Sequence, residues 1–175
     1  GVNLDEEAAM FVVDRMLMRL EVKFAADFFV TGKWTGESTL SGANQWSTST
    51  STMFKNIEDA KIAVGDRIVK EPKVMIIGRA VWSAIIQHPN FLDRMKTTSD
   101  KIPTIGLAQQ LFDIPRIMVA RALKATNVEG QTITKARVLG KNALLLYVTP
   151  RASLLSPTAG YPFFWPALGP GYPEY

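Results

Sequence analysis

The sequence predicts an α+β fold, in which one long helix precedes a small mixed sheet that is covered by short helices. A helical hydrophobic period runs without glycine or proline from Leu4 to about Val30, and a polar loop follows it. Beyond the loop, short apolar runs alternate with short helical segments. The chain has 175 residues, of which 47% are hydrophobic, so it is long enough to bury one core.

The N-terminal segment has the pattern of a single amphipathic helix, because apolar residues recur at steps of three and four. Asn3 can cap its N-terminus, and Gly32 can end it. At 1.5 Å per residue such a helix reaches roughly 40 Å, which suits a spine. We expect its apolar face to pack on the sheet of the same chain, so that truncating Phe24 to alanine costs roughly 3 to 5 kcal/mol. The face comprises Val13, Leu20, Phe24 and Phe28.

Residues 32–52 predict a surface loop, since glycine, serine and threonine are frequent in them and no hydrophobic period runs through them. Two tryptophans interrupt this polarity, and three adjacent aromatic residues, Phe163 to Trp165, fall in the proline-rich segment near residues 162–173. Such irregular segments bury large aromatic side chains poorly by themselves, and aromatic side chains anchor interfaces between proteins. The predicted subunit-interface site therefore comprises Trp34, Trp46, Phe163, Phe164 and Trp165.

The rest of the chain predicts the short elements of the domain. Asn56 and Asp59 resemble a capping arrangement that opens a helix through Ile68, and Pro72 closes this helix off. Two other segments have helical spacing, and four apolar runs have the length of strands. The expected helices are residues 79–87 and 105–112, and the expected strands are residues 73–77, 116–120, 143–148 and 161–165.

Composition and charge exclude several classes of site. The chain contains no cysteine, which rules out disulfides, thiolate zinc sites and cysteine nucleophiles within it. Its net charge is +4, but the 20 lysines and arginines never form a run of five, so the charge is too diffuse to identify a nucleic-acid partner. No apolar stretch approaches the roughly 20 residues of a membrane-spanning helix. The chain opens with Gly1 and no signal segment, so we expect a cleaved, trimmed or partial product.

No motif for catalysis, a cofactor or a metal stands out in the sequence. The only histidine, His88, precedes Pro89 at the end of a helical segment, where we expect it to satisfy C-terminal carbonyls. The chain lacks the glycine-flanked serine of hydrolases and the glycine-rich loops that cradle phosphates. Adjacent carboxylates at residues 5–7 and at Glu58 and Asp59 fall in expected first helical turns, where the helix dipole accounts for them. We therefore predict no enzyme, no cofactor and no metal site.

Several stretches resemble the central part of the major capsid proteins of tailed bacteriophages with the Hong Kong 97-like fold. Each stretch is a packing pattern rather than a chemical motif, so the likeness lies in their order and spacing. The stretches are residues 21–29 (EVKFAADFF), 31–34 (TGKW), 57–60 (IEDA), 74–82 (VMIIGRAVW) followed by His88 and Pro89, 107–114 (LAQQLFDI) and 139–148 (LGKNALLLYV).

The resemblance implies a structural subunit that assembles with itself, as hexamers and pentamers, into an icosahedral head around double-stranded DNA. It implies a spine helix of a peripheral domain in residues 1–31, an axial domain in residues 32–149 and a return segment in residues 150–175. The implied location is the virion, after assembly in the cytoplasm of the bacterial host. The N-terminal arm and extended loop that precede the spine helix in this family are missing from the chain.

The resemblance also suggests which partners to expect. A scaffold, a maturation protease, a portal and decoration proteins are the partners of such subunits. The diffuse charge of +4 favours weak, non-specific contact with packaged double-stranded DNA, and no membrane is involved.

Two other classes of function stay open on sequence grounds. One is a basic, non-enzymatic module that binds or organises nucleic acid, although no aromatic residues are interleaved with its lysines and arginines for base stacking. The other is an enzyme that uses carboxylates. Particle size separates these classes, because a shell protein forms very large particles or hexamers and pentamers, whereas a module or an enzyme elutes as a small species.

Overall fold

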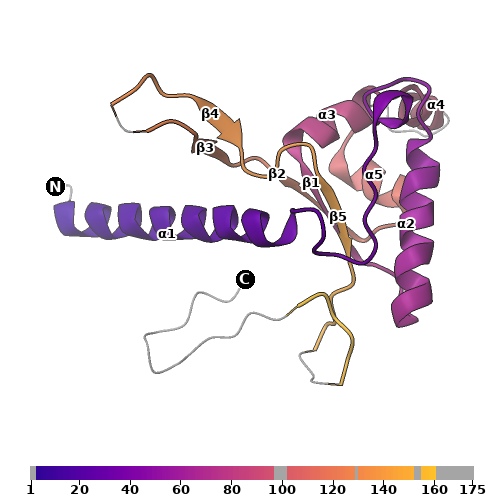
Figure 1. The fold of residues 1–175 in the computed structure, drawn as a ribbon, viewed down its shortest axis with the longest axis horizontal. Helices are drawn as coiled ribbons and strands as arrows, with labels where there is room; N and C mark the ends of the chain where they lie inside the picture. The colour runs from indigo at the N-terminus through magenta and orange to yellow at the C-terminus, as the bar shows by residue number, and fades with distance from the viewer. Residues whose placement is uncertain (1–2, 97–101, 129, 152–154, 161–175) are drawn as a thin grey trace.

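The computed structural model describes residues 3–96, 102–128, 130–151 and 155–160 (Figure 1). A 25-residue helix, α1 (Leu4–Phe28), projects from one side of the molecule. A loop with one 3-10 turn at Gly42–Asn44 leads from α1 to the helices that surround a small sheet. The expected α+β class, with a long helix and a small mixed sheet, is confirmed.

The sheet has three strands in the order β2-β1-β5. The central strand pairs in parallel with β2 and antiparallel with β5, so the sheet is mixed. A parallel pair needs a long crossover connection, and the segment between β1 and β2 supplies it with three helices. The strands are β1 (Val74–Gly78), β2 (Arg116–Ala120) and β5 (Ala143–Leu146).

Four short helices enclose the core, and Figure 1 shows them grouped on the side of the sheet away from α1. Their apolar side chains meet those of β1 and β2 in one cluster. The helices are α2 (Met53–Ile68), α3 (Arg79–Gln87), α4 (Pro89–Lys96) and α5 (Ile105–Phe112). The largest fully buried side chains are Met53, Ile77, Ile85, Phe91 and Ile114.

The long helix is continuous as predicted, but its expected packing on the sheet is wrong. Asn3 caps α1 by accepting the Asp5 N–H at 3.3 Å, and the helix ends at Phe28, before Gly32. Val13 and Leu20, however, are 53% and 52% exposed. The hydrophobic period identifies an apolar face and carries no information on what covers it.

The expected loss of stability on truncating Phe24 changes too, because α1 does not pack on the sheet. Its half-buried ring contacts the rings of Phe28 and Phe29, with centroids 4.9 and 5.9 Å away, at the C-terminal end of its own helix. Such a ring is not a core aromatic, so the 3 to 5 kcal/mol expected for its truncation does not apply to the single chain.

Three other elements differ from the sequence prediction. α2 begins at Met53, one turn before the expected Asn56 cap, and Glu58 and Asp59 therefore lie in its interior. α4 is absent from the sequence prediction, because Pro89 is compatible with a helix end, whereas proline is also favoured in the first helical turn. The strand at 143–148 is shorter, at Ala143–Leu146, and the expected strand at 161–165 lies outside the described residues.

A two-stranded hairpin was also missed. Along the chain, β3 (Leu123–Ala125) and β4 (Lys135–Arg137) follow β2 and precede β5, and they pair antiparallel with each other. This hairpin projects from the sheet in the same direction as α1 (Figure 1). Asn127 holds its end together, since its side chain bonds to the Thr132 carbonyl at 2.8 Å and to the Thr134 N–H at 2.9 Å. Cations and threonines in this stretch obscure the apolar alternation that marks a strand.

Candidate intersubunit surface

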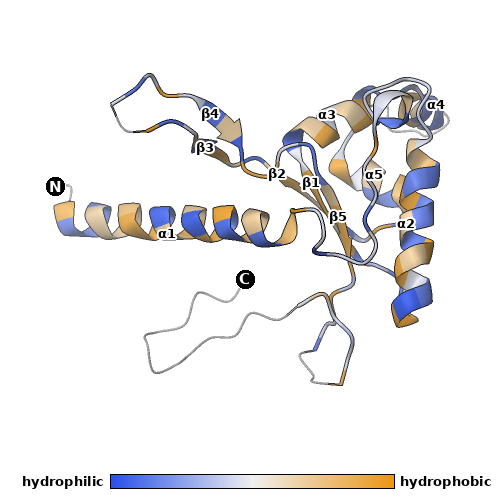
Figure 2. Ribbon diagram, viewed as in Figure 1, coloured by the Kyte–Doolittle hydropathy of each residue, from blue (hydrophilic) through white to orange (hydrophobic). Residues whose placement is uncertain are grey.

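The apolar side chains of α1 form an uncovered surface of the described chain. Figure 2 shows hydrophobic residues along its whole length. Ala25 is the only buried residue of α1, and seven large apolar side chains between Leu4 and Leu20 are at least half exposed. Exposed apolar surface of this extent marks a site of association. The seven are Leu4, Met10, Phe11, Val12, Val13, Met16 and Leu20.

The start of the following loop folds back on the C-terminal end of α1. The Trp34 Nε1–H donates to the Phe28 carbonyl at 2.7 Å, and the two rings lie 5.9 Å apart. Glu37 accepts hydrogen bonds from the backbone N–H of Gly32 at 2.7 Å and of Trp34 at 2.8 Å. This predicted interface tryptophan is therefore half-buried against its own helix.

These backbone hydrogen bonds make Glu37 sensitive to pH. The bonds from Gly32 and Trp34 hold the pKa of the exposed Glu37 carboxyl below its ordinary value. Because the pKa is lowered, the ionised carboxylate orders the loop at every pH above the ordinary pKa of a glutamate. This ordering is lost as the pH falls through the pKa that Glu37 has in the folded loop. In an NMR titration, the amides of Gly32 and Trp34 should therefore shift together with the Glu37 carboxyl. Amides that shift in the same way in Glu37→Gln would contradict the assignment.

The second predicted interface tryptophan has a different environment. Trp46 is half-buried against the core cluster, and its Nε1–H is buried without a hydrogen-bond partner among the described residues. The two tryptophans of this loop thus pack on different parts of the molecule, Trp34 on the end of α1 and Trp46 on the core cluster, and they do not form one patch. The other three predicted interface residues, Phe163, Phe164 and Trp165, lie outside the described residues. The interface role of all five stays a prediction.

The hairpin is a candidate surface that the sequence interpretation missed. Four cations and one acid occur between Arg121 and Arg137, whereas α1 has four carboxylates and no cation between Leu4 and Asp14. Directly opposed residues of an antiparallel pair share a face, so Leu123 and Arg137 lie on the same face as Ala125 and Lys135. Charge counted over a window of this length, rather than as runs, could have identified both segments.

His88 does not have the expected role. It is 2% exposed, and its Nε2 lies 3.0 Å from the Ser51 Oγ, which is equally buried. Its Nδ1 accepts the Asn90 N–H at 3.2 Å, in the first turn of α4. Because Nδ1 accepts, the ring N–H is on Nε2 and donates to the Ser51 Oγ. The ring fixes the end of the loop to the α3–α4 junction instead of satisfying helix carbonyls.

Removing the serine hydroxyl tests this structural role. In Ser51→Ala the buried Nε2–H of His88 loses its acceptor, so the free energy of unfolding should fall by about 1 to 3 kcal/mol. Chemical denaturation measures the change. Ser49→Ala is the matched control, since Ser49 is exposed in the same loop and should change stability by less than about 0.5 kcal/mol. Equal effects of the two variants would contradict the hydrogen bond.

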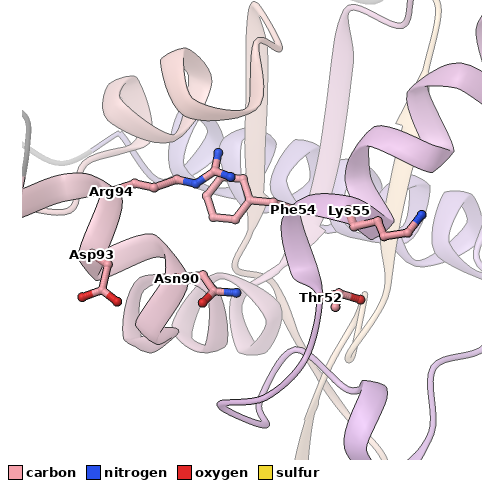
Figure 3. Close-up of a pocket in the computed structure, with 6 residues that line it drawn as sticks. All are labelled: Thr52, Phe54, Lys55, Asn90, Asp93 and Arg94. Atoms are coloured by element: carbon pink, nitrogen blue, oxygen red, sulfur yellow. The ribbon is translucent and has the colours of Figure 1, made fainter.

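Two grooves lie beside α2 in the described part of the chain, and neither brings together a catalytic arrangement of side chains. Figure 3 shows Thr52, Phe54, Lys55, Asn90, Asp93 and Arg94 around one of them. Its charges are engaged by neighbours: the Arg94 guanidinium lies 3.8 Å from the Phe54 ring centroid, and Lys55 pairs with Asp59 at 2.8 Å. Glu58 likewise pairs with Lys61 at 3.3 Å. Glu58 and Asp59 are thus explained by ion pairs along the helix rather than by the helix dipole.

The part of the chain that the structure describes has neither a group of metal-ligating side chains nor a membrane-spanning helix. No three acidic or histidine side chains there gather in a way that could hold a metal ion. Nor does any helix of that part combine the length and apolar character needed to cross a membrane.

A long helix with exposed apolar side chains, attached to a small domain, offers a surface for association with another chain. Comparison with known proteins identifies the family to which the chain belongs. Residues 13–154 match the family described as Phage major capsid protein E. A crystal structure of a phage-related protein from Bordetella bronchiseptica RB50 has a similar fold, with a TM-score of 0.82 and 28% identity, over 92% of this chain and 54% of that one.

Two curated relatives carry the same description, major capsid protein. That of Burkholderia phage BcepMu is 28% identical over 109 residues, which make up 62% of this chain and 34% of the relative. That of Pseudomonas phage JBD67 is 23% identical over 149 residues, or 84% of this chain and 46% of the relative. The chain belongs to the phage major capsid protein E family. It spans about a third to about a half of the length of these two relatives.

Proposed function

We propose that this chain forms part of a major capsid subunit, which assembles with copies of itself into the head of a tailed phage. The family match over residues 13–154 carries the proposal. The exposed apolar side chains of α1 support it, because a subunit that completes its packing in an assembly leaves such a surface in the single chain. The role is structural, without catalysis.

The proposed architecture follows the Hong Kong 97-like fold. Residues 1–31 would form the spine of a peripheral domain, residues 32–149 an axial domain and residues 150–175 a return segment. Hexamers and pentamers of the subunit would enclose double-stranded DNA, with which they make weak, non-specific contact. Assembly would take place in the host cytoplasm, and scaffold, protease, portal and decoration proteins are the proposed further partners. The long α1 and the separate small domain support this division.

Particle size tests the proposal. The protein that carries this chain should form very large particles, or hexamers and pentamers, when it is produced in bacteria. Electron microscopy and light scattering measure this outcome. A small monodisperse species under all conditions, together with tight binding to DNA, would favour the nucleic-acid module, for which the basic hairpin is the supporting feature.

A further inference from the structure

The hairpin and the outer half of α1 are two projecting elements of opposite charge. The outer half, from Leu4 to Met16, has four carboxylates and one cation, Arg15, which lies over the Phe11 ring. The hairpin has four exposed cations. Both elements leave the sheet in the same direction (Figure 1). The carboxylates are Asp5, Glu6, Glu7 and Asp14, and the cations are Arg121, Lys124, Lys135 and Arg137.

The two elements do not neutralise each other within the single chain. All eight charged side chains are exposed, and no ion pair joins α1 to the hairpin among the described residues. Both elements also expose large apolar side chains beside their charges. Those of the hairpin are Leu123, Val128 and Ile133, which are 45%, 76% and 70% exposed.

We infer that the hairpin of one subunit docks on the outer half of α1 of a second copy of this chain. Opposite charges on the two surfaces fix the pairing, and apolar side chains on both supply contact area. The inference rests on the proposed self-assembly. A contact between two different surfaces is heterologous, so it propagates from copy to copy and can close into rings.

The composition of the hairpin favours a protein partner over nucleic acid. A surface for a nucleic-acid backbone needs cations, and a single-strand site adds aromatic side chains on which bases stack. The hairpin has no aromatic residue between Arg121 and Arg137, and it exposes aliphatic side chains that a phosphate backbone does not contact. The acidic and apolar end of α1 has both of the complementary properties.

Charge reversal tests the contact in the protein that carries this chain. Lys135→Glu with Arg137→Glu places two carboxylates on one hairpin face, opposite the acidic helix, so particle yield should fall at least about tenfold. Glu6→Lys with Glu7→Lys should lower it similarly, and the two pairs combined should restore most of the yield. The matched control is Lys70→Glu with Lys141→Glu, which makes the same change in net charge at exposed lysines outside both elements and should leave the yield unchanged.

Disulfide trapping separates this inference from the proposed function. The chain has no cysteine of its own, so Glu6→Cys and Lys135→Cys introduce its only thiols. Mixing the two singly substituted proteins under oxidation should give a cross-linked heterodimer whether or not large particles form. Particles without this heterodimer would overturn the docking and leave self-assembly intact. A bond formed only within the doubly substituted chain would show that the contact lies inside one subunit.

The remaining outcomes also decide the question. A hairpin reversal that leaves the yield unchanged but lowers the amount of packaged DNA would overturn the inference in favour of a nucleic-acid contact. An equal loss in the Lys70 and Lys141 control would show that net charge, rather than this pairing, limits assembly.

Discussion

Replacing Phe91 with alanine is expected to lower the free energy of unfolding of the subunit by about 3 to 5 kcal/mol. The ring belongs to α4, is 0% exposed and contacts the ring of Phe112 with centroids 6.1 Å apart. Its removal loses the transfer free energy of a whole aromatic ring and leaves a cavity between α4 and α5 that the surrounding helices fill only in part. Denaturant titration followed by circular dichroism measures the loss.

Phe11→Ala is the matched control for this cavity. Phe11 is 58% exposed on α1, and its described contact is the Arg15 guanidinium 4.8 Å from the ring centroid. The same truncation should therefore change the free energy of unfolding by less than about 0.5 kcal/mol. If the two variants were equally destabilised, the division between a packed domain and an uncovered helix would be wrong.

Gly78→Ala should destabilise the sheet by about 3 kcal/mol, because there is no space for a methyl group. A Cβ at Gly78 would meet the backbone oxygen of Gly140, which lies only 2.2 Å from its position. The neighbouring turn cannot easily move away, since the Gly78 N–H donates to the Asn142 carbonyl at 3.0 Å and Gly140 has a φ of +60°. Thermal and denaturant unfolding of the variant measure the effect.

Gly65→Ala is the control that separates this steric effect from a general effect of replacing glycine. Gly65 lies inside α2, and nothing approaches the position of its Cβ within 4 Å. Alanine favours a helix interior over glycine by about 0.5 to 1 kcal/mol, so this variant should be more stable than the parent. A Gly78→Ala protein as stable as the parent would show that the β4–β5 connection is looser than the structure has it.

The sequence was most informative where local patterns determine the structure. The hydrophobic periods predicted α1, α3 and α5 closely, and the apolar run beginning at Arg116 predicted β2 with its bounds. α4 and the hairpin could not be predicted in this way. Pro89 is compatible with both the end and the start of a helix, and β3 and β4 are held by pairing with each other rather than by burial.

The candidate surface was only partly predictable, because exposure is a property of the tertiary structure. The same apolar spacing describes a helix face that is covered and one that is not, so the exposure of Val13 and Leu20 could not be obtained from it. His88 illustrates a second limit. Its partner Ser51 is 37 residues away in sequence, and no local pattern connects the two.

The pairing of β1 with later strands delays the formation of the sheet while the protein is being synthesised. β1 finds its partners only when β2 and β5 have been synthesised, and β5 ends about 120 residues after α1. At about 5 to 20 residues per second, roughly 6 to 24 seconds separate the completion of α1 from that of β5. Throughout this interval α1 has been synthesised, while the sheet of β1, β2 and β5 cannot yet form. The apolar residues of α1 are therefore made well before the sheet is complete, and seven of them remain at least half exposed in the folded chain.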